Sequence, residues 1–149
     1  MTTIRQATRD DALILGALTL QEGVAAGGAT RPGFVIEFAD AWLAQCEQMP
    51  TWIAFGDDGS AIGFVQTSLV RKLPSLRREA SSWIHVKNVF VVESARGNKV
   101  AERMLTEMIA WGDANNVSRY QLNAEPKARS LYERLGFGAP NGRLMERHS

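Results

Sequence analysis

The pattern of apolar and polar positions predicts how the chain begins. Residues 3–8 alternate as a half-buried strand does, and Asp10 or Asp11 is suited to cap the helix that the following Ala, Leu and Ile residues favour. That helix should weaken where glycines accumulate, and Pro32 can begin a second helix, which Pro50 ends. We therefore expect a strand followed by two helices.

The middle of the chain is rich in β-branched and aromatic residues. Runs 52–55 and 61–70 flank the turn sequence Gly-Asp-Asp-Gly at residues 56–59, which predicts a hairpin. Segment 71–79 contains a proline and several basic residues and should form an exposed loop. Residues 83–92 form the next β-prone run, whose apolar end predicts a strand near the centre of a sheet.

The rest of the chain predicts an alternation of helices and strands. Apolar side chains recur at helical spacing through residues 100–111, which predicts a helix that buries one stripe. A strand near 119–122, a helix over 126–135 stopped by Gly136, and a last strand near 144–146 should follow.

Length and charge narrow the class of protein. The chain has 149 residues and is expected to form a single domain over residues 1–149. Its 45% hydrophobic and 22% charged residues are typical of a globular protein. Lys and Arg number 17 and Asp and Glu 16, and the resulting net charge of +1 argues against a general nucleic-acid binder.

The cysteine and histidine counts exclude two kinds of site. Cys46 is the only cysteine, so an internal disulfide cannot form, and His85 and His148 do not complete a metal-ligand spacing with it. The first residues lack the pattern of a secretory signal, and no apolar run approaches the length that crosses a bilayer. We therefore expect a cytoplasmic protein with no metal and no membrane partner.

The most informative stretch joins a strand to a helix. After the apolar run 89–92, a short loop containing Gly97 leads into the helix that begins near Val100. Backbone N–H groups at a helix start have no partners in the helix and can bind a phosphate, which a glycine allows to approach closely. The pattern predicts a pyrophosphate site, although a surface loop that binds nothing, or the phosphate site of a nucleotide-binding protein, fits the same residues.

Two segments resemble motifs of the GNAT superfamily of N-acetyltransferases. Residues 88–92 (Asn-Val-Phe-Val-Val), followed by 96–101 (Arg-Gly-Asn-Lys-Val-Ala), resemble its acetyl-CoA signature, with Lys99 where the family usually has a glycine. The Leu-Tyr-Glu-Arg-Leu-Gly-Phe run within 127–137 is similar to the end of the family's last helix. The predicted order of elements agrees with the family along the whole chain.

This resemblance implies a fold and an activity. The fold would be of the α/β (α+β) class, with a central mixed, mostly antiparallel sheet flanked by helices and with its fourth and fifth strands splayed apart. The activity would be transfer of an acetyl group from acetyl-CoA to a primary amine of a small molecule or peptide, by direct attack in a ternary complex and without a metal. The amine is the expected partner, and a homodimer is common among such proteins.

The resemblance also assigns residues to the cosubstrate. Backbone groups of the fourth strand would pair with the pantetheine arm, and the following loop and helix start would hold the pyrophosphate. Glu125 stands where many relatives carry an asparagine, and Asn123 is its expected substitute. The expected cofactor-binding residues are Val89, Phe90, Val91, Arg96, Gly97, Asn98, Lys99, Val100, Ala101, Glu102 and Asn123.

For catalysis, the resemblance places Tyr132 near the sulfur of CoA, where its phenol would protonate the departing thiolate. The backbone N–H of Val91 would meet the oxyanion. Lys87 stands where many relatives have a glutamate base, so the base is unassigned. His85 is the candidate, because in a regular strand it shares a face with Lys87 and Val89.

Two points stay open. Glu22, on the first predicted helix, can bind an ammonium group, although a solvated helix face is the usual place for such a residue. Because Lys87 and Lys99 replace residues expected in the family, the alternative function is a catalytically weak acyl-CoA-binding sensor or interaction module of the same fold.

Overall fold

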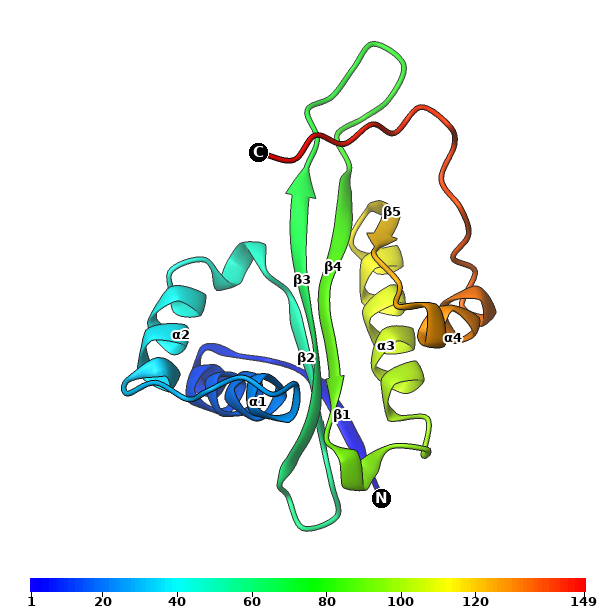
Figure 1. Cartoon of the computed structure of the whole chain (residues 1–149). Helices are drawn as coiled ribbons and strands as arrows, with labels where there is room; N and C mark the ends of the chain where they lie inside the picture. Colours follow the sequence, from blue (N-terminus) through cyan, green and yellow to red (C-terminus); the bar gives the residue numbers. More distant parts are fainter.

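The computed structural model describes residues 1–149 (Figure 1). The helices and strands occur in the predicted order up to residue 134. Their bounds are β1 (Thr3–Gln6), α1 (Ala12–Ala25), α2 (Phe34–Leu43), β2 (Thr51–Phe55), β3 (Ala61–Arg71), β4 (Ser82–Val91), α3 (Val100–Ala114), β5 (Val117–Leu122) and α4 (Arg129–Arg134).

A five-stranded sheet in the order β1-β2-β3-β4-β5 forms the centre of the molecule. All neighbouring strands are antiparallel except β4 and β5, which run parallel. Helices α1 and α2 cover one face, and α3 and α4 lie on the other (Figure 1). The predicted α/β fold with a mixed, mostly antiparallel sheet is therefore confirmed.

Each face of the sheet has its own buried cluster, because alternate side chains of a strand point to opposite faces. The apolar stripe of α3 predicted from the sequence is buried against one face, where it contacts Ile84 and Val86 of β4. Leu15 and Trp42, from α1 and α2, pack with Phe64 and Phe90 on the other face. The four buried residues of the α3 stripe are Val100, Met104, Leu105 and Met108.

Strand β4 contains a bulge at Lys87. Asn88 pairs with Gln66 of β3, whereas Val86 pairs with the next residue, Thr67, so Lys87 is an extra residue without an opposite partner. The bulge reverses the alternation of side chains: Val86 and Val89 both contact the α3 cluster, although they are three residues apart. The sequence-based expectation that His85 shares a face with Val89 is therefore wrong, because it assumed a regular strand.

Strands β4 and β5 separate after a short paired region. Their register ends at Val86 and Leu122, and β5 pairs with no residue of β4 beyond Val86. Residues 87–91 of β4 therefore have a neighbouring strand on the β3 side only. The predicted splay of the fourth and fifth strands is confirmed.

The last predicted strand, near 144–146, is wrong. Residues 135–149 contain no helix or strand, and the side chain of Met145 is 90% exposed. A strand is stable only when its backbone groups pair with a neighbour, but the C-terminal segment (red in Figure 1) leaves a cavity of about 810 Å³ between itself and β5. No helix in the fold combines the length and apolar character required to cross a membrane.

Candidate active site

The start of α3 has the geometry of an anion-binding site. No side chain caps the helix at Lys99, so the backbone N–H groups of Val100, Ala101 and Glu102 have no partner within the helix. The positive end of the helix dipole adds to the field of these groups. A single 3-10 turn, Glu93–Ala95, connects this helix start to the end of β4.

Two residues of the connecting loop have left-handed backbone conformations. Gly97 has a φ of 87° and Lys99 a φ of 58°. A glycine adopts such a conformation without steric cost, whereas a lysine does so at a cost of roughly 1 kcal/mol. This conformation gives a physical reason for the glycine that the family usually has at position 99. Lys99 meets the same backbone requirement under strain and adds an exposed cation beside the helix start.

Arg96 joins this loop to the open edge of β4. Its Nε donates to the carbonyl of Val91 at 3.0 Å, and its two terminal nitrogens have no protein partner. The next N–H along the strand, that of Val92, donates to Ile62 of β3 at 2.8 Å. Since backbone groups alternate in direction along a strand, those of Val89 and Val91 face away from β3, whereas those of Phe90 face toward it.

The side chain of Glu102 is already engaged. It accepts hydrogen bonds from Nε and Nη2 of Arg134 at 3.1 and 3.0 Å, which joins α3 to α4. Its backbone N–H remains the group that it can offer to an anion. The guanidinium of Arg103 donates to the carbonyl of Thr2 at 3.1 Å.

Tyr132 lies on α4, half-buried against the sheet. Its ring packs edge-to-face on Phe137, with 5.9 Å between ring centroids. Its hydroxyl makes no hydrogen bond to a protein group. The hydroxyl is not among the buried polar atoms, so it is accessible to solvent. Burial raises the pKa of this phenol, so it stays protonated at neutral pH.

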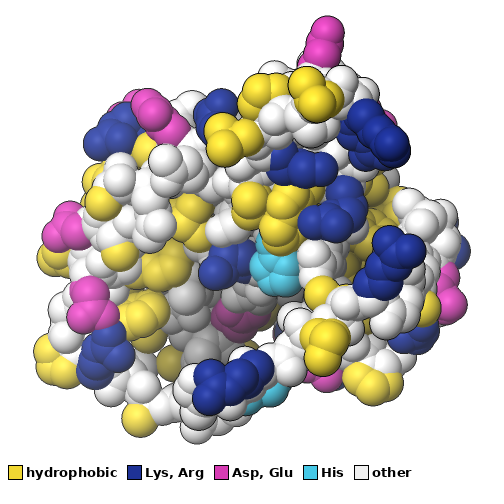
Figure 2. Space-filling view, turned by 90° about the horizontal axis from the view of Figure 1, so that it is seen from above, with side chains coloured by type: hydrophobic (Ala, Val, Ile, Leu, Met, Phe, Trp, Pro, Cys, Tyr) yellow, Lys and Arg dark blue, Asp and Glu magenta, His cyan; other side chains and the backbone are white.

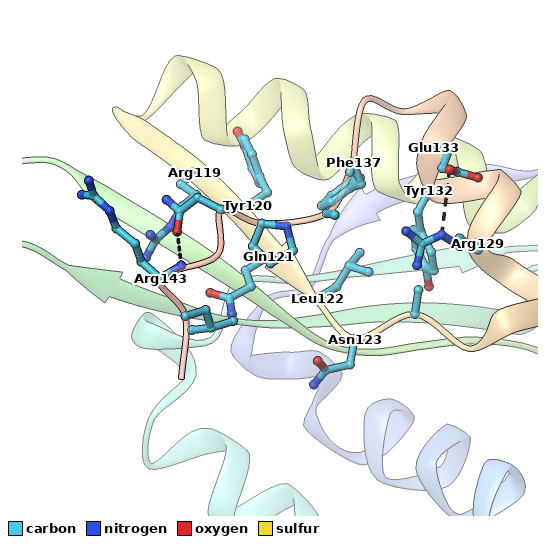
Figure 3. Close-up of a pocket in the computed structure, with 16 residues that line it drawn as sticks. Arg119, Tyr120, Gln121, Leu122, Asn123, Arg129, Tyr132, Glu133, Phe137 and Arg143 are labelled. Atoms are coloured by element: carbon cyan, nitrogen blue, oxygen red, sulfur yellow. Dashed lines mark hydrogen bonds and ion pairs between the residues drawn. The ribbon is translucent and has the colours of Figure 1, made fainter. Parts of the chain in front are cut away.

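Tyr132 and Asn123 line the same cavity, between β5, α4 and the C-terminal segment (Figure 3). Asn123 follows the last residue of β5, where that strand diverges from β4. Figure 3 shows the ring of Tyr132 extending from α4 toward the strands, while Arg129 and Glu133 pair on the same helix. The two predicted site residues thus come together at the point where the strands separate.

Glu22 occupies a position that the sequence alone does not reveal. It lies in the last turn of α1, partly buried, and its Oε1 accepts a hydrogen bond from Nδ2 of Asn88 on β4. Burial raises the pKa of this carboxyl, and the hydrogen bond from Asn88 opposes the rise. No cation lies within ion-pair distance of the carboxylate. The default expectation of a fully solvated helix face is therefore wrong for Glu22.

His85 belongs to the same face of β4 as Asn88 and Phe90. Ile84 and Val86, on either side of His85, both contact the α3 cluster, so His85 lies on the opposite face of the sheet. The bulge brings Asn88 and Phe90 to that same face. His85 pairs with Gln121 of β5, and its imidazole makes no hydrogen bond within the protein. Its role as the base stays a prediction. Figure 2 shows the molecule from above, where its surface is hollowed and histidine, basic and acidic side chains lie near the hollow.

Comparison with known proteins identifies the family. A family model described as acetyltransferase (GNAT) matches residues 25–137. The chain belongs to this family. The region matched contains the loop before α3 and the α4 motif, so it covers both segments that suggested the resemblance. A search of curated protein sequences finds no significant match.

Solved structures of the family share the fold over nearly the whole chain. A predicted acetyltransferase from Clostridium acetobutylicum, solved with acetyl-CoA, is 19% identical with a TM-score of 0.75 and covers 99% of this chain and 96% of its own. A ribosomal-protein-alanine N-acetyltransferase from Brucella melitensis is 21% identical, with a TM-score of 0.74 and full coverage of both chains. Glucosamine-6-phosphate N-acetyltransferase from Arabidopsis thaliana is 13% identical, with a TM-score of 0.74, covering 100% of this chain and 99% of that one.

Two of these relatives have different acceptors in their names, a ribosomal-protein alanine and glucosamine-6-phosphate, and at these identities all three support the fold alone. The acceptor of the present chain therefore has to be inferred from its own residues. The structure contains no group of three or more His, Cys, Asp or Glu side chains placed to hold a metal ion.

Proposed function

We propose that the protein transfers an acetyl group from acetyl-CoA to a primary amine of a small molecule or peptide, by direct attack in a ternary complex. The observation that carries this proposal is the proximity in the chain of two features: the open edge of β4 at residues 87–91 is followed, after a short loop with one 3-10 turn, by the uncapped start of α3. A thioester-bearing arm can pair with the first while its diphosphate reaches the second.

The open edge supports binding of the pantetheine arm by strand addition. The backbone groups of Val89 and Val91 face the open side and are suited to pair with the amides of the arm, while Phe90 holds the strand in register by packing in the core. Because the Val91 carbonyl already accepts from Arg96, the Val91 N–H is its free group at this edge.

The loop and helix start support binding of the diphosphate. The first backbone N–H groups of α3 have no partner in the helix and can donate to the diphosphate, and the free terminal nitrogens of Arg96 can add charge-assisted hydrogen bonds. Lys99 supplies a further cation, and Asn123 lies on the opposite side of the gap, at the end of β5.

Bound acetyl-CoA would supply the activated acyl group, and protein residues would stabilise the negative charges that develop on the carbonyl oxygen and the sulfur during transfer. The N–H expected to donate to the carbonyl oxygen as negative charge develops on it is that of Val89 and not, as the resemblance implies, that of Val91, because the Val91 N–H pairs with the arm and lies nearer the diphosphate. The unengaged hydroxyl of Tyr132 is the expected donor of a proton to the departing sulfur. Because burial raises the pKa of Tyr132, its phenol keeps at neutral pH the proton that this step requires.

A thermal-shift measurement tests the choice of cosubstrate. At a concentration about 100 times its Kd, acetyl-CoA should stabilise the protein by about 2.7 kcal/mol, which raises Tm by roughly 5 to 10 °C for a chain of this length. ATP shares the adenosine and phosphates but lacks the pantetheine arm, so its effect should be much smaller. Equal stabilisation by ATP, or none by acetyl-CoA, contradicts the proposal.

Gly97→Ala should reduce this stabilisation, with an acetyl-CoA Kd raised by roughly tenfold, because a φ of 87° is strained for any residue with a Cβ and the loop must rearrange. Gly142→Ala is the matched control, since that glycine has no positive φ and an added Cβ meets nothing within 4 Å. A normal Kd for Gly97→Ala would show that the loop does not hold the diphosphate.

A measurement of turnover distinguishes the proposed transferase from the alternative, a catalytically weak acyl-CoA-binding sensor or interaction module. Incubation with acetyl-CoA and a panel of amines (a dipeptide, a lysine side-chain analogue, an aminosugar and an aliphatic diamine) should release free CoA thiol well above the rate without protein. A protein that acetyl-CoA stabilises but that releases no thiol with any amine would support the sensor.

A further inference from the structure

The proposed reaction needs a group that removes a proton from the acceptor amine. We propose that the carboxylate of Glu22, held by the side-chain amide of Asn88, binds the acceptor ammonium and takes its proton. This inference rests on the proposed acetyl transfer. It assigns the acceptor-binding end of the site to the junction of α1 and β4, and it gives the reaction a base that is not on β4.

Position is the first argument. Asn88 lies within the open segment of β4 and on the face covered by α1 and α2, so its partner Glu22 lies beside the edge where the thioester would bind. The bulge at Lys87 creates this arrangement, because in a regular strand Asn88 would share the α3 face with Val86, whereas the extra residue turns Asn88 to the opposite face. An amine held by Glu22 would approach the thioester from the α1 side, across the sheet from α3.

Charge is the second argument. A half-buried carboxylate is normally compensated by a cation, yet Glu22 has one neutral donor, Asn88, and no ion-pair partner. An acceptor ammonium would provide the missing opposite charge. Burial raises the pKa of Glu22 toward the range in which a carboxylate is an effective general base near neutral pH.

Other titratable groups lie on the elements packed around Glu22, and none of them is paired with it. On β4 these are His85 and Lys87, and on α2 they are Glu37 and Asp40; none makes an ion pair or hydrogen bond with Glu22. Lys87 is exposed at the bulge and Glu37 is paired with Arg31. Strand β3, which also packs against α1, carries no titratable residue except Arg71 at its far end.

The proton and bond balance is complete without a further reactant. The bound ammonium first loses one proton to the Glu22 carboxylate, which releases it to water. The neutral amine then forms a bond to the acetyl carbon, its nitrogen loses a second proton to Glu22, and the carbon–sulfur bond breaks. The sulfur takes one proton from Tyr132. Glu22 then releases its proton to water and Tyr132 recovers one, so an amide and the free thiol of CoA are the products.

The experiment compares Glu22→Gln with Glu107→Gln, an exposed control on α3 that has no side-chain partner. With the best amine of the panel, Glu22→Gln should lower kcat/KM at least tenfold and abolish the acid limb of its pH profile, whereas the control should match the wild type. The rise in Tm with acetyl-CoA should be normal in both variants, which shows that folding and cosubstrate binding persist.

The acceptor's basicity provides a second readout. Hydroxylamine is uncharged at neutral pH and does not need a base to free its nitrogen, so its enzyme-dependent rate should fall much less in Glu22→Gln than the rate with an alkylamine. Asn88→Ala removes the donor that lowers the pKa of Glu22, and the acid limb should therefore move to higher pH.

An unchanged kcat/KM and an intact acid limb in Glu22→Gln would overturn the inference, and transfer of the limb's dependence to His85→Gln would assign the base to His85 instead. A wild type that releases thiol with no amine would refute the proposed function itself. The two failures are distinguishable, because only the second affects the wild-type protein.

Discussion

Replacing Tyr132 with phenylalanine should lower kcat for acetyl transfer by about 100-fold or more, with little change in the Kd of acetyl-CoA. The substitution removes a single hydroxyl, which bonds to no protein group, and keeps the ring that packs on Phe137. The loss should therefore appear in turnover and not in stability. Steady-state thiol release and the thermal shift with acetyl-CoA measure the two quantities.

The chain has only one other tyrosine, and it serves as the control. The single proton of the Tyr120 hydroxyl is shared between the carbonyl of Ile109, at 3.0 Å, and Oδ1 of Asp113, at 2.9 Å, and burial raises the pKa of this phenol. Tyr120→Phe should cost about 1 kcal/mol of stability and leave turnover per folded molecule unchanged. Normal turnover in Tyr132→Phe would remove this residue from the mechanism.

Asp11→Ala should lower the free energy of unfolding by about 2 to 3 kcal/mol. The Asp11 side chain is buried and accepts from both terminal nitrogens of Arg5, at 2.8 and 2.9 Å, and from the backbone N–H of Thr8 at 2.7 Å. The variant leaves all three donors without their acceptor at the point where β1 passes into α1. Urea unfolding at pH 7 measures the loss, and Asp10→Ala, an exposed neighbour without a partner, should differ from the wild type by a few tenths of a kcal/mol at most.

The same carboxylate gives a pH dependence with a definite sign. The hydrogen bonds from Arg5 hold the pKa of Asp11 below its ordinary value, so this contribution is complete above the unfolded-state pKa of about 4 and is lost as the pH falls through the folded-state pKa. The stability difference between wild type and Asp11→Ala should therefore shrink below pH 4. A difference that is constant down to pH 2 would show that the charge of Asp11 contributes nothing.

Local patterns were sufficient to predict most of the fold. The hairpin around residues 56–59, the buried stripe of α3 and the order of elements up to residue 134 all follow from hydrophobic periodicity and turn residues. The strand expected near 144–146 had the right composition, but a strand depends on a partner edge, which sequence composition does not report.

The candidate site was predictable where it is local in sequence and not where it depends on tertiary contacts. The loop from Arg96 to Glu102 lies within seven consecutive residues, and its motif was sufficient to identify it. Glu22 and Asn88 are 66 residues apart, and their contact depends on how α1 packs on the sheet. The bulge at Lys87 was also missed, since no residue type marks it and periodicity arguments assume a regular strand.

The bulge has a consequence for how β4 tolerates change. Because Lys87 is exposed and pairs with nothing opposite, exchanging its side chain should disturb little, whereas deleting the residue would rotate one part of the strand against the other. Asn88 would then turn toward α3 and Phe90 would leave its aromatic neighbour Phe64. The contribution of position 87 is therefore the extra backbone residue itself, whatever its side chain. When related chains are aligned, an insertion or gap at this position indicates a change in the geometry of the proposed site.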